Sequence, residues 1–296
     1  MTAFFCDSNC ELNYKYLEEL NITNVIYMPY SICDEEKYFD MGKAYDAKAF
    51  FDLVRAGNTP KTSALNPAEY ITYFEPFFAK GEDIFYVSFS HSMSGTFKYM
   101  DMAIKELSAK YPNVKFTCYD TKAISMSAGL MVYAAAKQFN AGKSVDEICA
   151  YLDEIQQHMH AHVTVDDLQY LKRGGRITAT SAIIGGLLKL KPLIKLVDFG
   201  MLQSFGTVPG RNKAMLSLAD EVIKTATDIK DFPIAILTAD CRPEAERVKA
   251  RILSQLPDAT VILCDVGPTI GAHCGPGTIG ICFKSTSTRP VAPKAK

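Results

Sequence analysis

The sequence has no excess of basic charge. Its 296 residues include 32 Lys and Arg against 33 Asp and Glu, which gives a net charge of −1 at pH 7. Proteins that bind nucleic acid or an anionic membrane surface present a basic patch or stripe. The charge balance therefore favours neither nucleic acid nor a membrane surface as a partner.

Long hydrophobic runs are also lacking. The most apolar glycine-containing stretch, residues 182–188, is ended by Lys189 and is much shorter than the roughly 20 residues of a membrane-spanning helix. The first seven residues contain no basic side chain and already reach Asp7, unlike the start of a secretory signal peptide. We therefore expect no integral membrane segment and a cytoplasmic protein.

Paired cysteine motifs are lacking as well. The nine cysteines are an odd number, are scattered along the chain, and include no C-x-x-C pair. A zinc ribbon or a thioredoxin-type site therefore has no support, and reduced thiols in the core fit better. Hydrophobic residues, by contrast, make up 48% of the chain, which is enough for two domains of about 150 residues each.

The order of the predicted elements indicates an α/β fold. Residues 3–8 and 24–29 read as buried strands on either side of a helix at residues 14–20. Strands at residues 85–90 and 114–120 each lead through a turn of small residues into a helix. Strands that alternate with helices form parallel sheets. We therefore predict a doubly wound, mostly parallel sheet in an N-terminal domain at residues 1–157.

The pattern changes at His158. Residues 193–196 and 201–208 flank a short turn and predict a β-hairpin, so the second sheet contains an antiparallel pair. Helices and strands alternate again from residue 210 to residue 266. We predict an α/β domain with a mixed or antiparallel sheet at residues 158–284, followed by a disordered tail at residues 285–296.

One stretch combines a strand, a small-hydroxyl turn and a helix. The strand that begins at Phe85 leads to Ser92, Ser94, Gly95 and Thr96, and a helix follows. The carboxyl ends of strands in open α/β sheets and the first N–H groups of helices both favour anions. The turn suits an anionic or strongly accepting head group. Helix capping alone also accounts for Ser and Thr there.

Three further segments carry candidate residues. The polar loop at residues 61–67 presents the hydroxyls of Thr62 and Ser63, although a solvated loop fits equally well. The Gly-Gly turn at residues 174–175 has Arg173 and Arg176 beside it and can form an anion-binding nest, or else a basic surface loop. A glycine-rich loop at residues 267–277 carries His273.

Three histidines, His158, His160 and His162, alternate along a predicted strand and would share one face. Such an arrangement is one way to begin a metal site. No fourth ligand with a recognisable spacing lies nearby, so no metal site is predicted and the role of these histidines stays open.

The Thr62-Ser63 loop, the turn at residues 92–96, and the segments at residues 170–177 and 271–277 occur together in this order. Their combination resembles the DegV family of bacterial fatty-acid-binding proteins, from about residue 3 to residue 284. The resemblance implies a two-domain α/β protein that holds one long-chain fatty acid in a tunnel between its domains. It also implies a carrier rather than an enzyme, with no cofactor. In some members the carboxyl group is presented to a separate ATP-dependent fatty-acid kinase, and the acyl phosphate passes toward phospholipid synthesis.

The resemblance also implies site residues. Thr62 and Ser94 match the hydroxyls that hold the carboxylate, and Arg176 and His273 match the basic groups around it. Ser63, Gly95, Thr96 and Arg173 are further candidates in the same segments, with Arg173 standing where the family often has Lys. His91 and Met93 stand where Ser and Leu are common.

The sequence also suggests where the acyl chain would lie and which charge would face the carboxylate. The small residues Ala182, Gly185 and Gly186, in a predicted apolar helix near residues 181–190, would leave space for the chain. Most of the affinity would come from buried methylenes, each contributing about 0.8 kcal/mol. We expect His273, beside a bound carboxylate, to be protonated with its pKa raised above the ordinary value near 6.5.

Two other functions fit parts of the sequence. A serine hydrolase would use Ser94 as nucleophile and His273 as base. Against this, Ser92 occupies the position of the first glycine in a G-x-S-x-G elbow, and no Asp is identifiable as the partner of His273. A dihydroxyacetone-kinase-like subunit that binds a small molecule is the other alternative.

Overall fold

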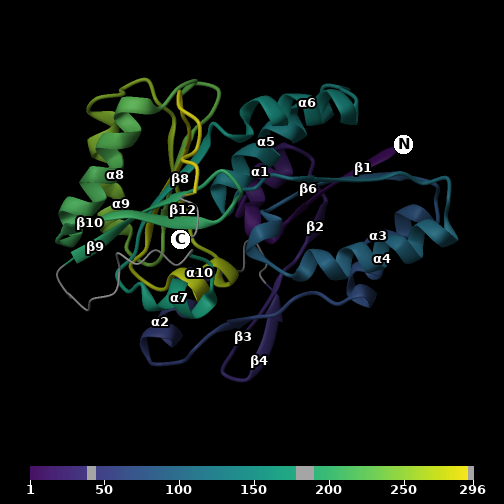
Figure 1. The fold of residues 1–296 in the computed structure, drawn as a ribbon, viewed down its shortest axis with the longest axis horizontal. Helices are drawn as coiled ribbons and strands as arrows, with labels where there is room; N and C mark the ends of the chain where they lie inside the picture. Colours follow the sequence, from purple (N-terminus) through teal and green to yellow (C-terminus); the bar gives the residue numbers. More distant parts are fainter. Residues whose placement is uncertain (39–44, 178–189, 293–296) are drawn as a thin grey trace.

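The N-terminal half of the chain forms a parallel four-stranded sheet in the order β2-β1-β6-β7, of which Figure 1 labels β1, β2 and β6. The computed structural model describes residues 1–38, 45–177 and 190–292. The four strands are β1 (Thr2–Asp7), β2 (Asn24–Ile26), β6 (Asp83–Ser88) and β7 (Phe116–Asp120). All three pairings are parallel, which confirms the predicted doubly wound arrangement.

The helices of this half include α1 (Tyr14–Glu19), α3 (Pro67–Phe78), α4 (Thr96–Lys110), α5 (Met126–Asn140) and α6 (Val145–Gln156). Side chains cap the starts of α1, α3 and α6. Ser144 and Glu147 form the predicted capping box of α6, in which each side chain accepts the other residue's backbone N–H. On α4, Phe97, Met100 and Leu107 are buried as their helical spacing predicts.

A small antiparallel sheet was not predicted. It consists of β3 (Pro29–Ile32), β4 (Glu35–Tyr38) and β5 (Lys61–Thr62) in the order β4-β3-β5, and α2 (Ala47–Arg55) lies between β4 and β5 in the chain. The turn between β3 and β4 places Cys33 and Asp34 at positive φ. Hairpin turns with positive φ are usually marked by Asn-Gly or Asp-Gly, and Cys-Asp gives no such signal. Because of this sheet, Thr62 lies on a strand rather than in the predicted loop.

The C-terminal half forms a mixed six-stranded sheet in the order β10-β9-β8-β13-β11-β12. Its strands are β8 (Met159–Thr164), β9 (Leu190–Leu196), β10 (Leu202–Pro209), β11 (Ile234–Thr238), β12 (Val261–Asp265) and β13 (Ile279–Lys284). The predicted hairpin is the antiparallel pair β9–β10. The two-sheet α/β fold class is thereby confirmed.

Helices cover this sheet and connect it to the first. α8 (Arg211–Thr225) and α9 (Arg242–Leu253) pack over a core of their own with Ile234, Ile279 and Ile281. α5 contacts strands of both sheets, and one continuous core includes buried residues from both halves. Two short helices, α7 (Gln169–Gly174) and α10 (Pro268–Cys274), pack against each other (Figure 1).

The predicted disordered tail is wrong for residues 285–292. Arg289 is 2% exposed, and its backbone N–H donates to Gln157 O at 2.7 Å. Its guanidinium donates to the carbonyls of Met159 and Lys122. The polar composition suggested disorder, but carbonyl groups from both halves accept hydrogen bonds from this buried cation. Residues 293–296 lie outside the described residues.

Candidate functional site

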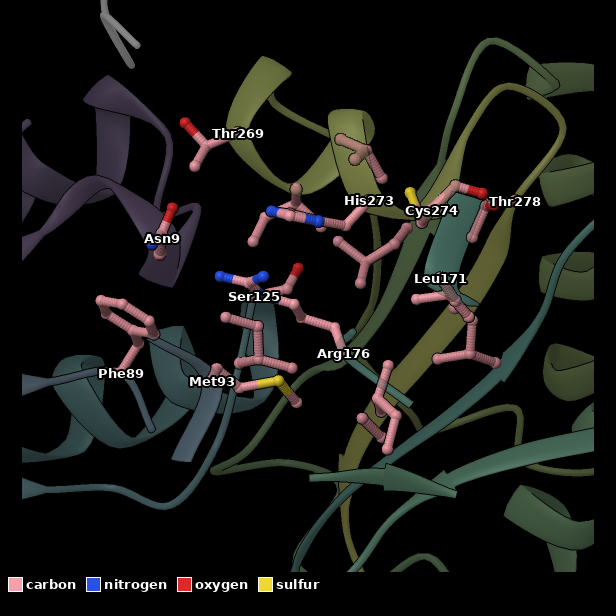
Figure 2. A pocket seen from close by; sticks show the side chains of 18 of the residues that line it. Asn9, Phe89, Met93, Ser125, Leu171, Arg176, Thr269, His273, Cys274 and Thr278 are labelled. Atoms are coloured by element: carbon pink, nitrogen blue, oxygen red, sulfur yellow. Dashed lines mark hydrogen bonds between the residues drawn. The ribbon is translucent and has the colours of Figure 1, made fainter. Parts of the chain in front are cut away.

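A cavity lies between the two halves of the molecule (Figure 2). The space within it, together with its opening to solvent, is about 920 Å³. The first half contributes Asn9, Met28, Thr62, Ser63, Phe89, Met93, Ser94, Ile124 and Ser125. The second half contributes Ala161, Val163, Leu171, Arg176, Leu202, Leu237, Val266, Thr269, Ile270, His273, Cys274, Thr278, Gly280 and Cys282.

The four principal residues predicted from the sequence, Thr62, Ser94, Arg176 and His273, all line this one cavity. Thr62 Oγ1 lies 2.9 Å from His273 Nε2, although the two residues are 211 positions apart. Ser94 follows the short 3-10 helix η2 (His91–Met93), and its hydroxyl accepts the backbone N–H of Thr96 at 3.2 Å. Two hydroxyls, an imidazole and a guanidinium are therefore available to one ligand.

His273 lies in the last turn of α10, which the sequence analysis had taken for a loop. Burial, together with the guanidiniums of Arg176 and Arg173, lowers the pKa of the ring from 6.5 to about 4. The ring is therefore neutral at pH 7 in the ligand-free protein, and the protonation expected beside a bound carboxylate stays a prediction for the complex. A Cβ on Gly174 would come within 2.2 Å of His273 Nδ1, so only glycine permits this packing.

The Gly-Gly turn does not form the predicted anion nest. Gly174 ends α7, and Gly175 follows with φ +67°. The N–H groups of Gly175 and Arg176 donate to the carbonyls of Lys172 and Leu171, which closes the helix as a Schellman motif. Both amides are thus already used. The positive group that remains is the Arg176 guanidinium, which also donates to Gly174 O and whose pKa is lowered by burial.

The less certain candidates divide into two groups. Ser63 lines the cavity and donates to Glu36 Oε1 at 3.0 Å. In the described part of the chain, the cavity lining does not include Gly95, Thr96 or Arg173. Thr96 is 1% exposed, because its hydroxyl accepts Leu65 N–H at 3.1 Å and lies 2.9 Å from the Tyr70 hydroxyl. Thr96 therefore supports the turn and does not face the ligand.

One face of the C-terminal sheet forms the apolar side of the cavity. Ala161 and Val163 of β8 lie opposite Cys282 and Gly280 of β13, and Leu237 of β11 lies opposite Gly280. Small side chains at Ala161, Gly280 and Cys282 leave space above the sheet. The predicted tunnel residues Ala182, Gly185 and Gly186 lie outside the described residues, so their placement stays a prediction.

The three histidines have no part in this cavity. Since Ala161 and Val163 face it, the alternation of β8 directs His160 and His162 to the opposite face. His158 Nδ1 lies 2.9 Å from Ser285 O, and His160 Nε2 lies 3.0 Å from Ser287 O. Across the described residues, no group of three or more His, Cys, Asp or Glu is placed to hold a metal ion.

The arrangement does not support a hydrolase. His273 Nε2 lies against Thr62, and His273 Nδ1 has no hydrogen-bond partner within the described ranges. A catalytic triad needs a carboxylate on that nitrogen to orient the base. The site therefore offers groups that hold a ligand, without the geometry of an activated serine.

Several lining residues were missed. Asn9, Ser125, Thr269 and Thr278 add polar groups that no sequence motif indicated. Thr269 and His273 are four residues apart, which would have placed them on one face had residues 268–274 been recognised as a helix. Ser125 has φ +54° and ψ −146°, a conformation that is rare outside glycine.

A buried carboxyl group fixes this part of the cavity. Glu11 is 5% exposed, and it accepts the backbone N–H of Gly267 and the hydroxyl of Ser125. Burial raises the pKa of Glu11 to about 7. Gly267 immediately precedes α10 and Ser125 immediately precedes α5, so this one side chain connects the two halves beside the cavity.

Comparison with known proteins identifies the fold. A family model described as "Uncharacterised protein, DegV family" matches residues 1–286. The chain belongs to the DegV family. A DegV domain-containing protein of Clostridium perfringens is 34% identical over 288 residues, which cover 97% of this chain and 99% of that protein. The family resemblance seen in the sequence is confirmed.

Solved DegV structures have the same architecture. DegV from Bacillus subtilis, described as a fatty acid binding protein, superposes with a TM-score of 0.78 at 25% identity over 96% of this chain and 99% of its own. A stearic acid-binding protein from Eubacterium ventriosum superposes with a TM-score of 0.82 at 23% identity over 96% and 98% of the two chains. Within the described residues of our DegV chain, no helix has the length and apolarity to cross a membrane.

Proposed function

We propose that this DegV protein binds one long-chain fatty acid in the cavity between its two halves. The observation that carries the proposal is the division of the cavity into a polar group, Thr62, Ser94, Arg176 and His273, and an apolar sheet face. A fatty acid has the same division. The DegV protein from Bacillus subtilis is described as a fatty acid binding protein, and this description supports the proposed ligand class.

The polar group suits a carboxylate. The hydroxyls of Thr62 and Ser94 can donate to its oxygens, and the half-buried Arg176 guanidinium supplies the opposite charge. The acyl chain would lie against Ala161, Gly280 and Cys282, where each buried methylene contributes about 0.8 kcal/mol. In this arrangement the chain supplies most of the affinity, and the polar group sets its direction.

We further propose that the protein is a cytoplasmic carrier that presents the carboxyl group to a separate fatty-acid kinase, and is not itself an enzyme. The support is chemical, because the cavity holds hydroxyls and the Arg176 guanidinium for a carboxylate, and among the described residues it holds no oriented catalytic base. Native mass spectrometry of the purified protein tests the ligand, with a long-chain fatty acid expected. Incubating the loaded protein with ATP and a purified fatty-acid kinase tests the carrier role, with acyl phosphate formed only when both proteins are present.

Ser94→Ala is expected to weaken binding of hexadecanoic acid to the delipidated protein about tenfold. The change removes one hydrogen bond to a charged group, worth about 1.5 kcal/mol at a partly exposed turn. Ser92→Ala is the matched control, because the Ser92 hydroxyl donates to Phe199 O at 2.8 Å. Equal losses in the two variants, measured by calorimetry, would show that Ser94 does not contact the head group.

Binding is expected to take up only a fraction of a proton at pH 7.5, and more as the pH falls. The pKa of His273 is about 4 without ligand, and an adjacent carboxylate raises such a pKa by roughly 1–3 units. The imidazole therefore gains a proton on binding only at a pH between its pKa in the free protein and its pKa in the complex. Affinity therefore falls as the pH rises through the His273 pKa of the complex and depends little on this residue above it.

Calorimetric titration in two buffers with different ionisation enthalpies measures this proton. His273→Gln should abolish the part of the uptake that grows as the pH falls. Uptake of a full proton at pH 8 that disappears in His273→Gln would mean that the complex stabilises the imidazolium far more than this geometry predicts.

A further inference from the structure

The cavity contains a second polar region, separate from Thr62 and Ser94. Asn9, Ser125 and Thr269 line it where the start of α10 meets the first half of the molecule (Figure 2). In the view of Figure 2, Asn9 and Thr269 lie on the side opposite Leu171 and Thr278. Asn9 is 6% exposed, and its Oδ1 has no hydrogen-bond partner among the residues that the structure describes. A buried amide oxygen left unpaired costs about 1–3 kcal/mol.

The chemistry of this region favours a donor. The Ser125 hydroxyl already donates to Glu11, and the Thr269 hydroxyl donates to Met28 O at 3.3 Å. With Glu11 ionised, each hydroxyl has spent its one proton and retains lone pairs, and Asn9 Oδ1 is a further acceptor. An ionised carboxylate only accepts hydrogen bonds, so it finds no partner in Asn9 Oδ1 or in the lone pairs of these two hydroxyls. A hydroxyl both donates and accepts, so it also satisfies the Asn9 amide in either orientation of its O and N atoms.

The position of the region along a ligand follows from α10. Thr269 and His273 are four residues apart on this helix, so about 6 Å of helix axis separates them. Thr269 Oγ1 bonds Met28 O, and Met28 N–H donates to the hydroxyl of Ser8, the neighbour of Asn9. The polar region thus lies close to the residues proposed to hold the carboxylate. It would contact the first carbons of a bound acyl chain.

We propose that Asn9, with Ser125 and Thr269, forms a subsite for a hydroxyl group near the carboxyl end of the fatty acid, so that the protein selects hydroxylated long-chain fatty acids. The inference rests on the proposed function and names its ligand class more closely. The subsite is rigid, because Glu11 joins Ser125 to Gly267 immediately before α10. It is therefore set up before the ligand arrives, and a hydroxyl entering it needs no rearrangement.

Competition calorimetry on the delipidated protein tests the proposal with 3-hydroxyhexadecanoic acid and hexadecanoic acid. The hydroxy acid is expected to bind about five- to tenfold more tightly, as one recovered hydrogen bond allows. Asn9→Leu should bring the ratio to within twofold of one while hexadecanoic acid still binds. Asn9→Ala is a second variant that removes the same amide without adding bulk.

Thr278→Val is the matched control, because Thr278 lines the cavity but its hydroxyl already donates to Cys274 O at 2.8 Å. This variant should keep the preference for the hydroxy acid. The subsite is refuted if the wild-type protein binds the two acids equally, because a water molecule then forms the hydrogen bond to the Asn9 amide. It is also refuted if the preference survives in both Asn9 variants. In those cases hexadecanoic acid still binds and the proposed function stands. If neither acid binds, the proposed function fails as well.

Discussion

Replacing Ala161 by phenylalanine is expected to abolish binding of hexadecanoic acid while the protein still folds. Ala161 is 3% exposed and lies on β8 in the face of the sheet that lines the cavity. A phenyl ring there would occupy the space of several methylenes. Excluding about six of them costs roughly 5 kcal/mol, which exceeds the loss of any one head-group hydrogen bond.

A series of sizes makes this test specific. Ala161→Val, Ala161→Leu and Ala161→Phe should shift the preferred ligand toward progressively shorter fatty acids, as native mass spectrometry of loaded protein can show. Ala219→Phe is the control, because Ala219 is fully buried in the separate core under α8. It introduces a comparable overpacking cost of roughly 1–3 kcal/mol. If both alanines gave the same profile of chain lengths, the chain would not lie on this sheet face.

Glu11→Gln is expected to make the protein more stable than the wild type at pH 8. The free energy of unfolding of the variant should also depend less on pH. The pKa of Glu11 is raised by burial from 4.5 to about 7, so the folded state holds its proton more tightly than the unfolded state. That stabilisation is complete below pH 4.5 and is lost as the pH rises to about 7. A difference of about 2.5 units corresponds to roughly 3 kcal/mol.

Glutamine retains an acceptor for Gly267 N–H and offers an N–H to the Ser125 hydroxyl, but it carries no charge. Urea unfolding at pH 5 and pH 8 measures the effect, and the wild-type protein should lose more stability over this range than the variant. Some pH dependence should remain, because burial also raises the pKa of Asp7 to about 7. The control is Glu147→Gln, which removes an exposed carboxylate whose pKa is lowered to about 2 by its capping box. Its titration lies below pH 5, so this variant should keep the wild-type slope between pH 5 and pH 8. Identical slopes in Glu11→Gln and wild type would mean that Glu11 is ionised in the folded protein throughout this range.

The parts of the fold that were predicted correctly depend on local patterns. Strands followed by helices predicted the parallel sheet around β1 and β6, and the turn at residues 198–200 predicted the β9–β10 hairpin. Residues 268–274 were misread as a loop because of their glycine and proline content, although Pro268 at the first position and Gly275 after the last are helix end signals. The hairpin at Cys33 and Asp34 was missed because neither residue marks positive φ.

The sequence by itself determined the α/β class and the order of most elements, because short-range periodicity carries that information. The family resemblance of its motifs implied the four residues Thr62, Ser94, Arg176 and His273, which line the cavity. Only the tertiary structure decided what surrounds them. The apolar face depends on β8, β13 and β11 lying side by side, although they are not consecutive in the chain. The neutral state of His273 and the unpaired amide oxygen of Asn9 depend on burial between two halves, and burial is a property of the packed chain that no local pattern encodes.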